Sequence, residues 1–292
     1  MALIPYLLVV ISATTHATWN LLAKRADGSQ IFLGLSKLSE GILLAPIVAI
    51  YLVIHPEPLA RYWYLIVIGA IPTTLNYVFL GRAYARGHLS TVYPVARSSA
   101  LVYLPFLAAV FLGEHIDWVG GISIALIIAG IFAMQLDSFQ REDMQNILSG
   151  FRHLSMIYAL LAGLMVAGYS LWDKHSLGYL SAFPYYYGYT LLSGIIYASV
   201  LRTRYSWQAF REEVAAHRWR IPAVGMLNTF TYMLVLIALA VSKASYVVAL
   251  RQLGIGFGAV MGWTILHEPS PLPKRIGLVL LLAGCLLVSF AR

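Results

Sequence analysis

Residues 3–23 read LIPYLLVVISATTHATWNLLA, a stretch that contains no Asp, Glu, Lys or Arg. A bilayer core about 30 Å thick is crossed by about 20 helical residues, so this stretch is long enough to span it. It is also longer than the apolar region of a secretory signal, which runs about 7–15 residues. We therefore predict that the chain begins with a membrane span.

Nine more apolar runs of similar size follow the first. They cover residues 31–54, 63–85, 91–112, 118–136, 154–173, 180–201, 221–241, 245–266 and 273–290. The longest connections, 137–153 and 202–220, mix both signs of charge and are expected to form surface helices or loops. The pattern predicts an all-α integral membrane protein of ten transmembrane helices.

Composition supports this fold class. Apolar residues make up 60% of the chain and charged residues only 11%, against about 25% in soluble domains, so there are too few charges to wet a soluble surface. The net charge of +8 arises from short Lys/Arg clusters between apolar runs, not from one broad basic face. This distribution is typical of membrane topology and argues against nucleic acid as a partner.

The first run has a counterpart in the second half of the chain. At an offset of 150 residues, Ala17, Trp19, Asn20 and Lys24 align with Ala167, Tyr169, Ser170 and Lys174; at 154, Arg97 and Glu114 align with Arg251 and Glu268. We predict a first five-helix repeat over 1–136, a connecting loop over 137–153 and a second repeat over 154–292. Because five is odd, the repeats enter the bilayer from opposite sides, an inverted arrangement with a central cavity.

The Lys and Arg residues outside the spans are distributed unevenly. Thirteen lie in connections on one side of the predicted bilayer and four on the other. The positive-inside rule places the rich side in the cytoplasm. We therefore expect a multi-pass protein of a bacterial-type inner membrane with both termini extracytoplasmic.

One face of the first span is polar. His16, Trp19 and Asn20 follow i, i+3, i+4 spacing, and Tyr169 occupies the Trp19 position in the second repeat. Unsatisfied polar groups are costly in lipid, so this face is expected to line a solute cavity. The alternative is that these side chains only hold helices together.

The third and eighth spans carry a similar polar face. Asn76 and Tyr77 lie on one side of the third span, and Tyr232 lies at the corresponding depth in the eighth. A tyrosine combines an apolar ring with a polar tip, which suits the wall of an amphipathic solute site. The interfacial aromatic belt is assigned Tyr62, Trp63, Tyr64 and many of Tyr185–Tyr189.

Arg97 and Arg251 each lie about two turns inside a span. An arginine at the bilayer centre costs roughly 3 kcal/mol on insertion scales, so it normally faces a cavity or a partner. A solute carboxylate would form two parallel hydrogen bonds with a guanidinium. The alternative is snorkelling to the interface. Lys37 and Glu40, three residues apart, are expected to form a structural ion pair, with proton coupling through Glu40 as the alternative.

Motifs for enzymes are missing from the sequence. It contains no H-E-x-x-H, G-x-S-x-G, paired-cysteine or phosphate-loop pattern. We therefore expect no catalytic residue, no metal, no cofactor and no ATP drive within this chain.

The chain resembles the EamA-type drug/metabolite transporter superfamily over nearly its whole length. The resemblance is carried by His16-Ala-x-Trp19-Asn20-x-x-x-Lys24, Gly113-Glu114, His267-Glu268, Gly121…Gly130 and Gly277…Gly284. It implies ten helices around a central cavity and, in known members, export of amino acids (aromatic ones among them) and other metabolites. It also implies a structural role for Gly113-Glu114 and His267-Glu268.

These observations together predict a secondary transporter that works by alternating access. We expect an exporter of aromatic or other amphipathic amino acids or related metabolites, monomeric, with a proton as one candidate coupling ion. Two alternatives stay open: a passive channel or facilitator, and an integral membrane enzyme acting on lipid-linked substrates.

Overall fold

The computed structural model describes residues 1–24, 29–86, 89–140, 153–265, 267 and 269–291. This described part is helical, with no strand. The helices are α1 Leu3–Lys24, α2 Gln30–Ile54, α3 Leu59–Tyr84, α4 Leu89–Leu112, α5 Trp118–Ala133, α7 Leu154–Ser176, α8 Ala182–Arg202, α9 Trp207–His217, α10 Arg220–Val241, α11 Ala244–Leu250, α12 Leu253–Ile265 and α13 Leu272–Val288.

Each predicted span corresponds to a helix, which confirms the all-α prediction. Within the described residues, seven segments are long and apolar enough to cross a membrane: α1, α2, α3, most of α4, α7, α10, and α11 with α12 taken together. The remaining three runs form α5 with 16 residues, α13 with 17, and α8, which carries five tyrosines in its 21 residues. Ten complete crossings therefore stay a prediction.

The outer surface of the bundle is apolar. On α2, Ile42, Ile50 and Val53 are each more than 60% exposed, and Leu3 and Ile4 are equally open on α1. Soluble monomers rarely expose continuous apolar patches of this kind. The exposed faces are suited to lipid, as expected for a multi-pass membrane protein.

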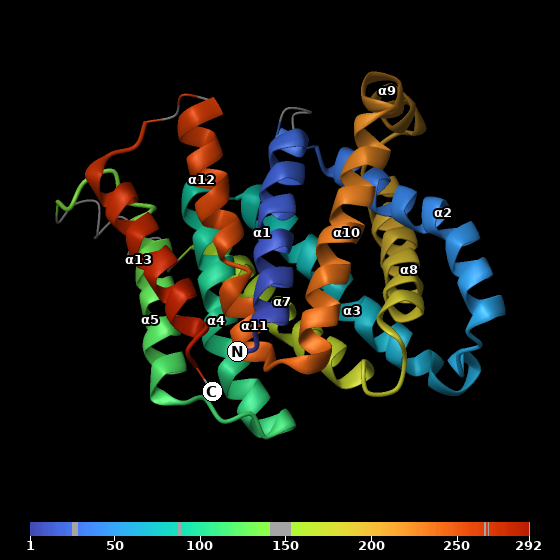
Figure 1. Ribbon diagram of the computed structural model, residues 1–292. Helices are drawn as coiled ribbons and strands as arrows, with labels where there is room; N and C mark the ends of the chain where they lie inside the picture. The colour runs from blue at the N-terminus through green and yellow to red at the C-terminus, as the bar shows by residue number, and fades with distance from the viewer. Residues whose placement is uncertain (25–28, 87–88, 141–152, 266, 268, 292) are drawn as a thin grey trace.

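Helices from the two halves of the sequence interleave. The helix α1 packs against α10 and α12, while α3 packs against α7 and α8, and α4 against α7. Figure 1 shows α1 between α10 and α12, and both views place α5 with α13 at one edge and α2 with α8 at the other. The centre of the molecule is therefore enclosed by helices from both halves.

Glycines allow α5 and α13 to approach at backbone distance. A Cβ added to Gly130 would lie 2.6 Å from the backbone nitrogen of Leu281, and one added to Gly277 would lie 2.6 Å from the carbonyl oxygen of Gly130. Gly121, on the opposite face of α5, has no such neighbour within 4 Å in the described structure. The close approach is typical of small-residue contacts between membrane helices.

The two ends of the bundle differ. Both termini lie at one end, while α9 lies at the other, beside the end of α8 and the start of α10 (Figure 1). The surface helix expected within 202–220 is confirmed as α9. The connection over 141–152 lies outside the described residues, and the orientation of the bundle in the membrane stays a prediction.

The start of α11 is capped from the first half of the chain. Gly113, after α4, takes a φ of 65°, a conformation that favours glycine, and places Glu114 beside α11. The Glu114 carboxylate accepts hydrogen bonds from the backbone N–H groups of Ala244 and Ser245 at 2.6 and 3.2 Å. A carboxylate satisfies the free N–H groups of a helix start and interacts favourably with its dipole. The predicted structural role of Gly113-Glu114 therefore has a direct physical basis, while Glu268 lies outside the described residues.

The preceding helix end is held from α7. The Lys174 ammonium donates to the carbonyl oxygens of Leu239 and Ser242 at 2.6 and 2.8 Å. Carbonyls at a helix C-terminus are otherwise unpaired and attract cations. One charged side chain from each half therefore holds the turn between α10 and α11. This turn positions α11 and, at its other end, Arg251.

Replacing Glu114 with Ala is expected to lower the free energy of unfolding by about 2 kcal/mol, because two buried N–H groups lose a charged acceptor. Thermal unfolding in detergent would measure the change. Glu212→Ala is the matched control, since Glu212 is exposed and is bonded by Gln208 of its own helix. Equal unfolding temperatures for the two variants would contradict the capping role.

Candidate functional site

The ninth predicted span is interrupted at its arginine. The helix α11 ends at Leu250 and α12 begins at Leu253, while the whole segment Ala244–Ile265 is long and apolar enough to form the span predicted over 245–266. The backbone N–H of Gln252 donates to Ala249, three residues back, and the Gln252 side chain donates to the carbonyl of Val248 at 3.0 Å. This local tightening replaces the regular α-helical bonds. Broken helices of this kind form the substrate sites of many transporters.

Arg251, at this break, is the first member of a series of buried polar contacts. Its guanidinium lies over the ring of Tyr232, 5.1 Å from the ring centre. The Tyr232 hydroxyl donates to one oxygen of Asp173 at 2.6 Å, and Tyr185 donates to the other at 2.8 Å. Asp173 is 1% exposed. These contacts connect α7, α8 and α10 with the helix break.

Arg97 reaches the polar face of α1. One of its terminal nitrogens lies 3.2 Å from Nε2 of His16. Because a guanidinium only donates, Nε2 is the acceptor in this bond. The backbone at Gly254 passes close enough that an added Cβ would lie 3.3 Å from the His16 ring. His16 therefore lies where α1, α4 and α12 meet.

Trp19 and Asn20 take different roles beside His16. The Trp19 ring meets the His16 ring edge to face, with centres 4.9 Å apart. The Asn20 amide donates to the His16 carbonyl at 2.7 Å, within its own helix. The Trp19 indole N–H is buried and has no hydrogen-bond partner among the described residues. A buried donor without a partner is costly, which makes this N–H an unusual feature of the bundle interior.

A group of tyrosines surrounds Tyr232. Its ring stacks on Tyr186 at 5.9 Å and meets Tyr169 and Tyr189 edge to face at 6.1 and 6.5 Å. Tyr185, Tyr186 and Tyr189 are all buried. Their assignment to the interfacial belt is therefore wrong, since α8 turns them toward α2, α3 and α10. Their spacing of i, i+1, i+4 places them on one helix face, which is the signal that could have identified them.

Glu40 forms a second buried centre next to these tyrosines. Its carboxylate accepts hydrogen bonds from Lys37 and Asn228, both at 2.9 Å, and from the hydroxyl of Tyr186. Thr190 adds a longer contact at 3.3 Å. The expected Lys37–Glu40 ion pair is confirmed, and Glu40 is 1% exposed. Tyr186 connects this centre to the ring of Tyr232.

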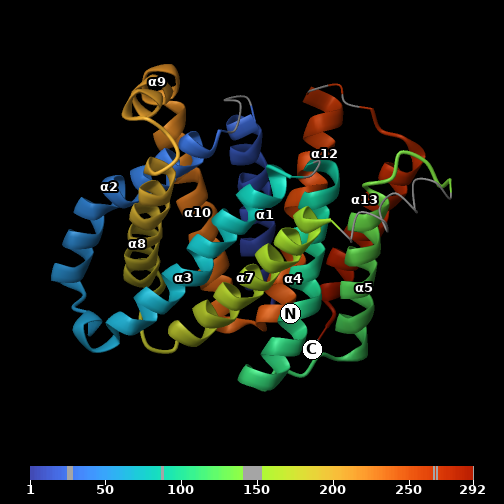
Figure 2. The same ribbon diagram turned by 180° about the vertical axis from the view of Figure 1, so that it is seen from behind.

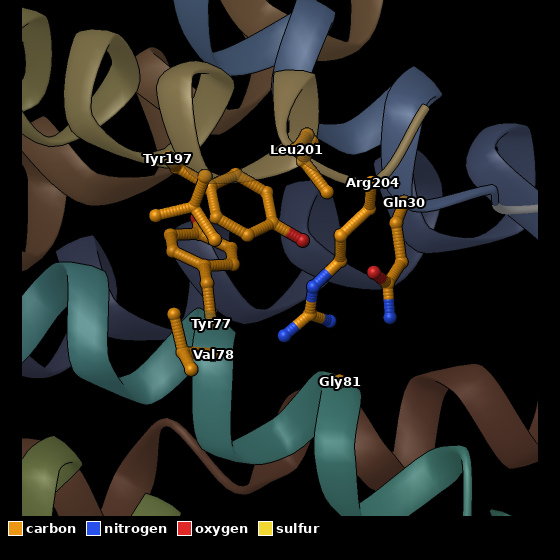
Figure 3. Close-up of a pocket in the computed structure, with 8 residues that line it drawn as sticks. Gln30, Tyr77, Val78, Gly81, Tyr197, Leu201 and Arg204 are labelled. Carbon is orange, nitrogen blue, oxygen red and sulfur yellow. The ribbon is translucent and has the colours of Figure 1, made fainter. Parts of the chain in front are cut away.

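Tyr77 packs against a tyrosine nearer the end of α8. Its ring stacks on Tyr197 at 5.3 Å, and the two rings line one side of a small cavity that also reaches Gly81 and Arg204 (Figure 3). The cavity volume is about 10 Å³, room for at most one water molecule. Asn76 is half-buried and, among the described residues, forms no hydrogen bond with the other predicted site residues.

A larger cavity of about 200 Å³ lies between α4, α5 and α7. Its lining is mostly apolar: Val95, Ser98, Ser99, Val102, Tyr103, Ile128, Phe132 and Leu160. None of the nine predicted site residues belongs to this lining. The polar cluster at the centre is therefore separate from this cavity.

The fold and its centre define a class of protein. Membrane-length helices enclose two arginines, a histidine and a carboxylate, and ionisable groups inside a membrane bundle mark solute or ion pathways. The molecule is therefore a multi-pass membrane protein with a polar centre of the kind that solute carriers use.

The chain belongs to the EamA-like transporter family, which matches residues 3–136 and again residues 153–290. The double match confirms the resemblance seen in the sequence and its two-repeat organisation. A crystal structure described only as that of a protein has the same fold, with a TM-score of 0.74, 14% identity, and coverage of 98% of this chain and 97% of that one. The comparison with curated proteins gave no match.

Proposed function

We propose that this protein is a secondary transporter in which two inverted five-helix repeats, over 1–136 and 154–292, exchange conformations. Such an exchange opens a central site to each side of the membrane in turn. The family match over two stretches supports the repeat. The Lys/Arg bias supports an inner-membrane location with both termini outside.

The helix contacts support this exchange. The order of the helices in the two predicted repeats equates α1 with α7, α2 with α8, α3 with α10 and α5 with α13. Under that equivalence, the α1–α10 contact is the counterpart of α3–α7, and α2–α10 is the counterpart of α3–α8. The contacts α2–α8 and α5–α13 map onto themselves. A set of contacts that is unchanged when the halves are exchanged is what alternating access by inverted repeats requires.

The central observation is the placement of the two arginines around His16 and Tyr232. Arg97 contacts His16, Arg251 lies over Tyr232, and the Trp19 ring meets the His16 ring edge to face. A guanidinium binds a carboxylate through paired hydrogen bonds, while the rings offer contact to an apolar side chain. We propose an amino acid or a related amphipathic metabolite as the solute, with aromatic amino acids first, exported without ATP.

Two buried carboxylates are candidates for carrying a coupling proton in this scheme. Asp173 is bonded by two tyrosine hydroxyls, and Glu40 is paired with Lys37. Because Glu40 already has a cation beside it, Asp173 is the better candidate. We further propose that one chain forms the complete transport unit, since the polar centre is built from helices of a single chain.

Counterflow into liposomes preloaded with unlabelled amino acids tests the function. We expect saturable, ATP-independent uptake by the wild type, and a loss on the order of 100-fold in Arg97→Ala and Arg251→Ala, because each removes a buried charged donor. Arg61→Ala is the matched control, since Arg61 is exposed at the start of α3 beside Tyr62.

Three results would contradict the proposal. Unchanged counterflow in both arginine variants would remove these residues from the pathway. Flux without saturation or counterflow would indicate a channel. Absence of flux with every amino acid would exclude this solute class and leave the fold unaffected.

A further inference from the structure

The surface helix α9 is attached to the bundle along one face. Phe210 is buried against Ile31, Tyr197 and Leu201. The ring of His217, the last residue of the helix, meets Phe32 edge to face at 5.6 Å. The helix is therefore held firmly against α2 and α8, and its remaining faces point outward.

One outward face of α9 combines aromatic, apolar and basic side chains. Trp207, Arg211, Val214 and Arg218 follow i, i+4, i+7, i+11 spacing, which aligns them in one stripe. All four are exposed, Trp207 by 55%. The Arg211 guanidinium lies 5.8 Å from the ring centre of Trp207, and Arg218 lies 5.6 Å from that of its neighbour Trp219, which is 75% exposed.

The acidic residues of α9 point away from this stripe. Glu213 lies 3.8 Å from His217, on the side of α9 that packs against the bundle. Glu212 accepts a hydrogen bond from Gln208 on the opposite side of the helix. The segment 202–220 carries five arginines against these two glutamates. The stripe thus presents positive charge and aromatic rings together.

The position of α9 matches this chemistry. It connects the end of α8 to the start of α10 at the end of the bundle away from both termini, as both views show (Figures 1 and 2). Helices that span the bilayer end at the headgroup level, where tryptophans are enriched. Arginines at that level attract anionic lipids.

We propose that the Trp207/Arg211/Val214/Arg218 stripe binds the headgroups of anionic phospholipids in the leaflet at this end of the bundle. The arginines contact lipid phosphates, and Trp207 and Val214 enter the boundary between headgroups and acyl chains. An amphipathic helix with basic and aromatic residues binds membranes in this manner. The helix acts as an anchor that senses the charge of the lipid surface.

Single-cysteine labelling of the full-length protein in vesicles tests the proposal. Val214→Cys lies in the stripe, and Ala216→Cys is exposed on the opposite side of α9, each in a Cys285→Ala background. We expect a fluorophore at 214 to be quenched by lipid-borne nitroxide and protected from aqueous iodide, about threefold more in anionic than in neutral vesicles. A fluorophore at 216 should show neither effect.

Charge variants separate lipid binding from simple proximity. In the 214-labelled protein, Arg211→Gln with Arg218→Gln should abolish the difference between anionic and neutral vesicles, whereas Arg61→Gln, at an exposed arginine beside Tyr62, should leave it intact. Equal iodide quenching at 214 and 216 would overturn the proposal and indicate a stripe that faces water or a soluble partner. An anionic-lipid effect that persists in the double variant would also overturn it.

Discussion

Replacing Glu40 with Ala should be among the most destabilising single changes in this protein, with an expected loss of about 3–5 kcal/mol in the free energy of unfolding. The reason is the position of Lys37, which is buried with Glu40 as its ion-pair partner at 2.9 Å. Without the carboxylate, the ammonium stays in the bundle as an uncompensated charge. The donors of Tyr186 and Asn228 also lose their acceptor.

A double variant distinguishes charge from packing in this prediction. Lys37→Met with Glu40→Gln removes both charges and keeps one acceptor oxygen, which can face Asn228 while the new NH2 donates to the Tyr186 hydroxyl oxygen, so it should unfold within about 1–2 kcal/mol of the wild type. Unfolding in detergent, followed by heat and by denaturant, would measure the three proteins. Glu57→Ala serves as the surface control, since Glu57 bonds only Ser181 among the described residues. If Glu40→Ala unfolded like this control, the ion pair would have no role in stability.

Adding one methyl group at Gly130 should have the next largest effect. The new Cβ would lie 2.6 Å from the backbone nitrogen of Leu281 and 2.7 Å from the carbonyl oxygen of Gly277. Backbone atoms cannot turn aside as a side chain can, so α5 and α13 must separate along their contact. We expect Gly130→Ala to cost about 3 kcal/mol, the upper range for overpacking.

The same substitution nine residues earlier provides the control. Gly121 has no neighbour within 4 Å among the described residues, so Gly121→Ala introduces no clash. Alanine also favours a helix over glycine by about 1 kcal/mol, so this variant should match or exceed the wild type in unfolding temperature. A pair of variants with the same unfolding temperature would show that α5 and α13 do not touch at Gly130.

The helices were predictable because a helix that crosses lipid must be apolar over about 20 residues, and such runs are visible in the sequence. Every predicted run contains a helix, and the surface helix between 202 and 220 follows from the mixed charges of that segment. The break at Arg251 was not predictable, because the residues Leu250 to Leu253 include neither glycine nor proline to signal it. At the break, the side-chain amide of Gln252 donates a hydrogen bond to the carbonyl of Val248, and this bond is seen only in the folded structure.

The candidate site was predictable where residue type alone is unusual for a membrane span. His16, Arg97 and Arg251 stand out in apolar runs, and the structure places Arg97 against His16 and Arg251 over Tyr232. Tyrosines near the end of a span fit both an interfacial belt and an interior wall, so Tyr185 and its neighbours were misassigned. The contacts of α8 with α2, α3 and α10 distinguish the two, and the contacts with α2 and α3 join distant parts of the chain.

The hydrogen bonds of Glu40 have a consequence for the order of synthesis. Apart from Lys37, its donors lie on α8 and α10, and Asn228 follows it by 188 residues. At about 5–20 residues per second, the ribosome needs roughly 10–40 seconds to supply that amide. Lys37 is the exception, because it precedes Glu40 on the same helix and is present from the start. The lysine therefore neutralises the carboxylate in the nascent protein until its later partners are made, which is a reason for this pair to lie on one helix.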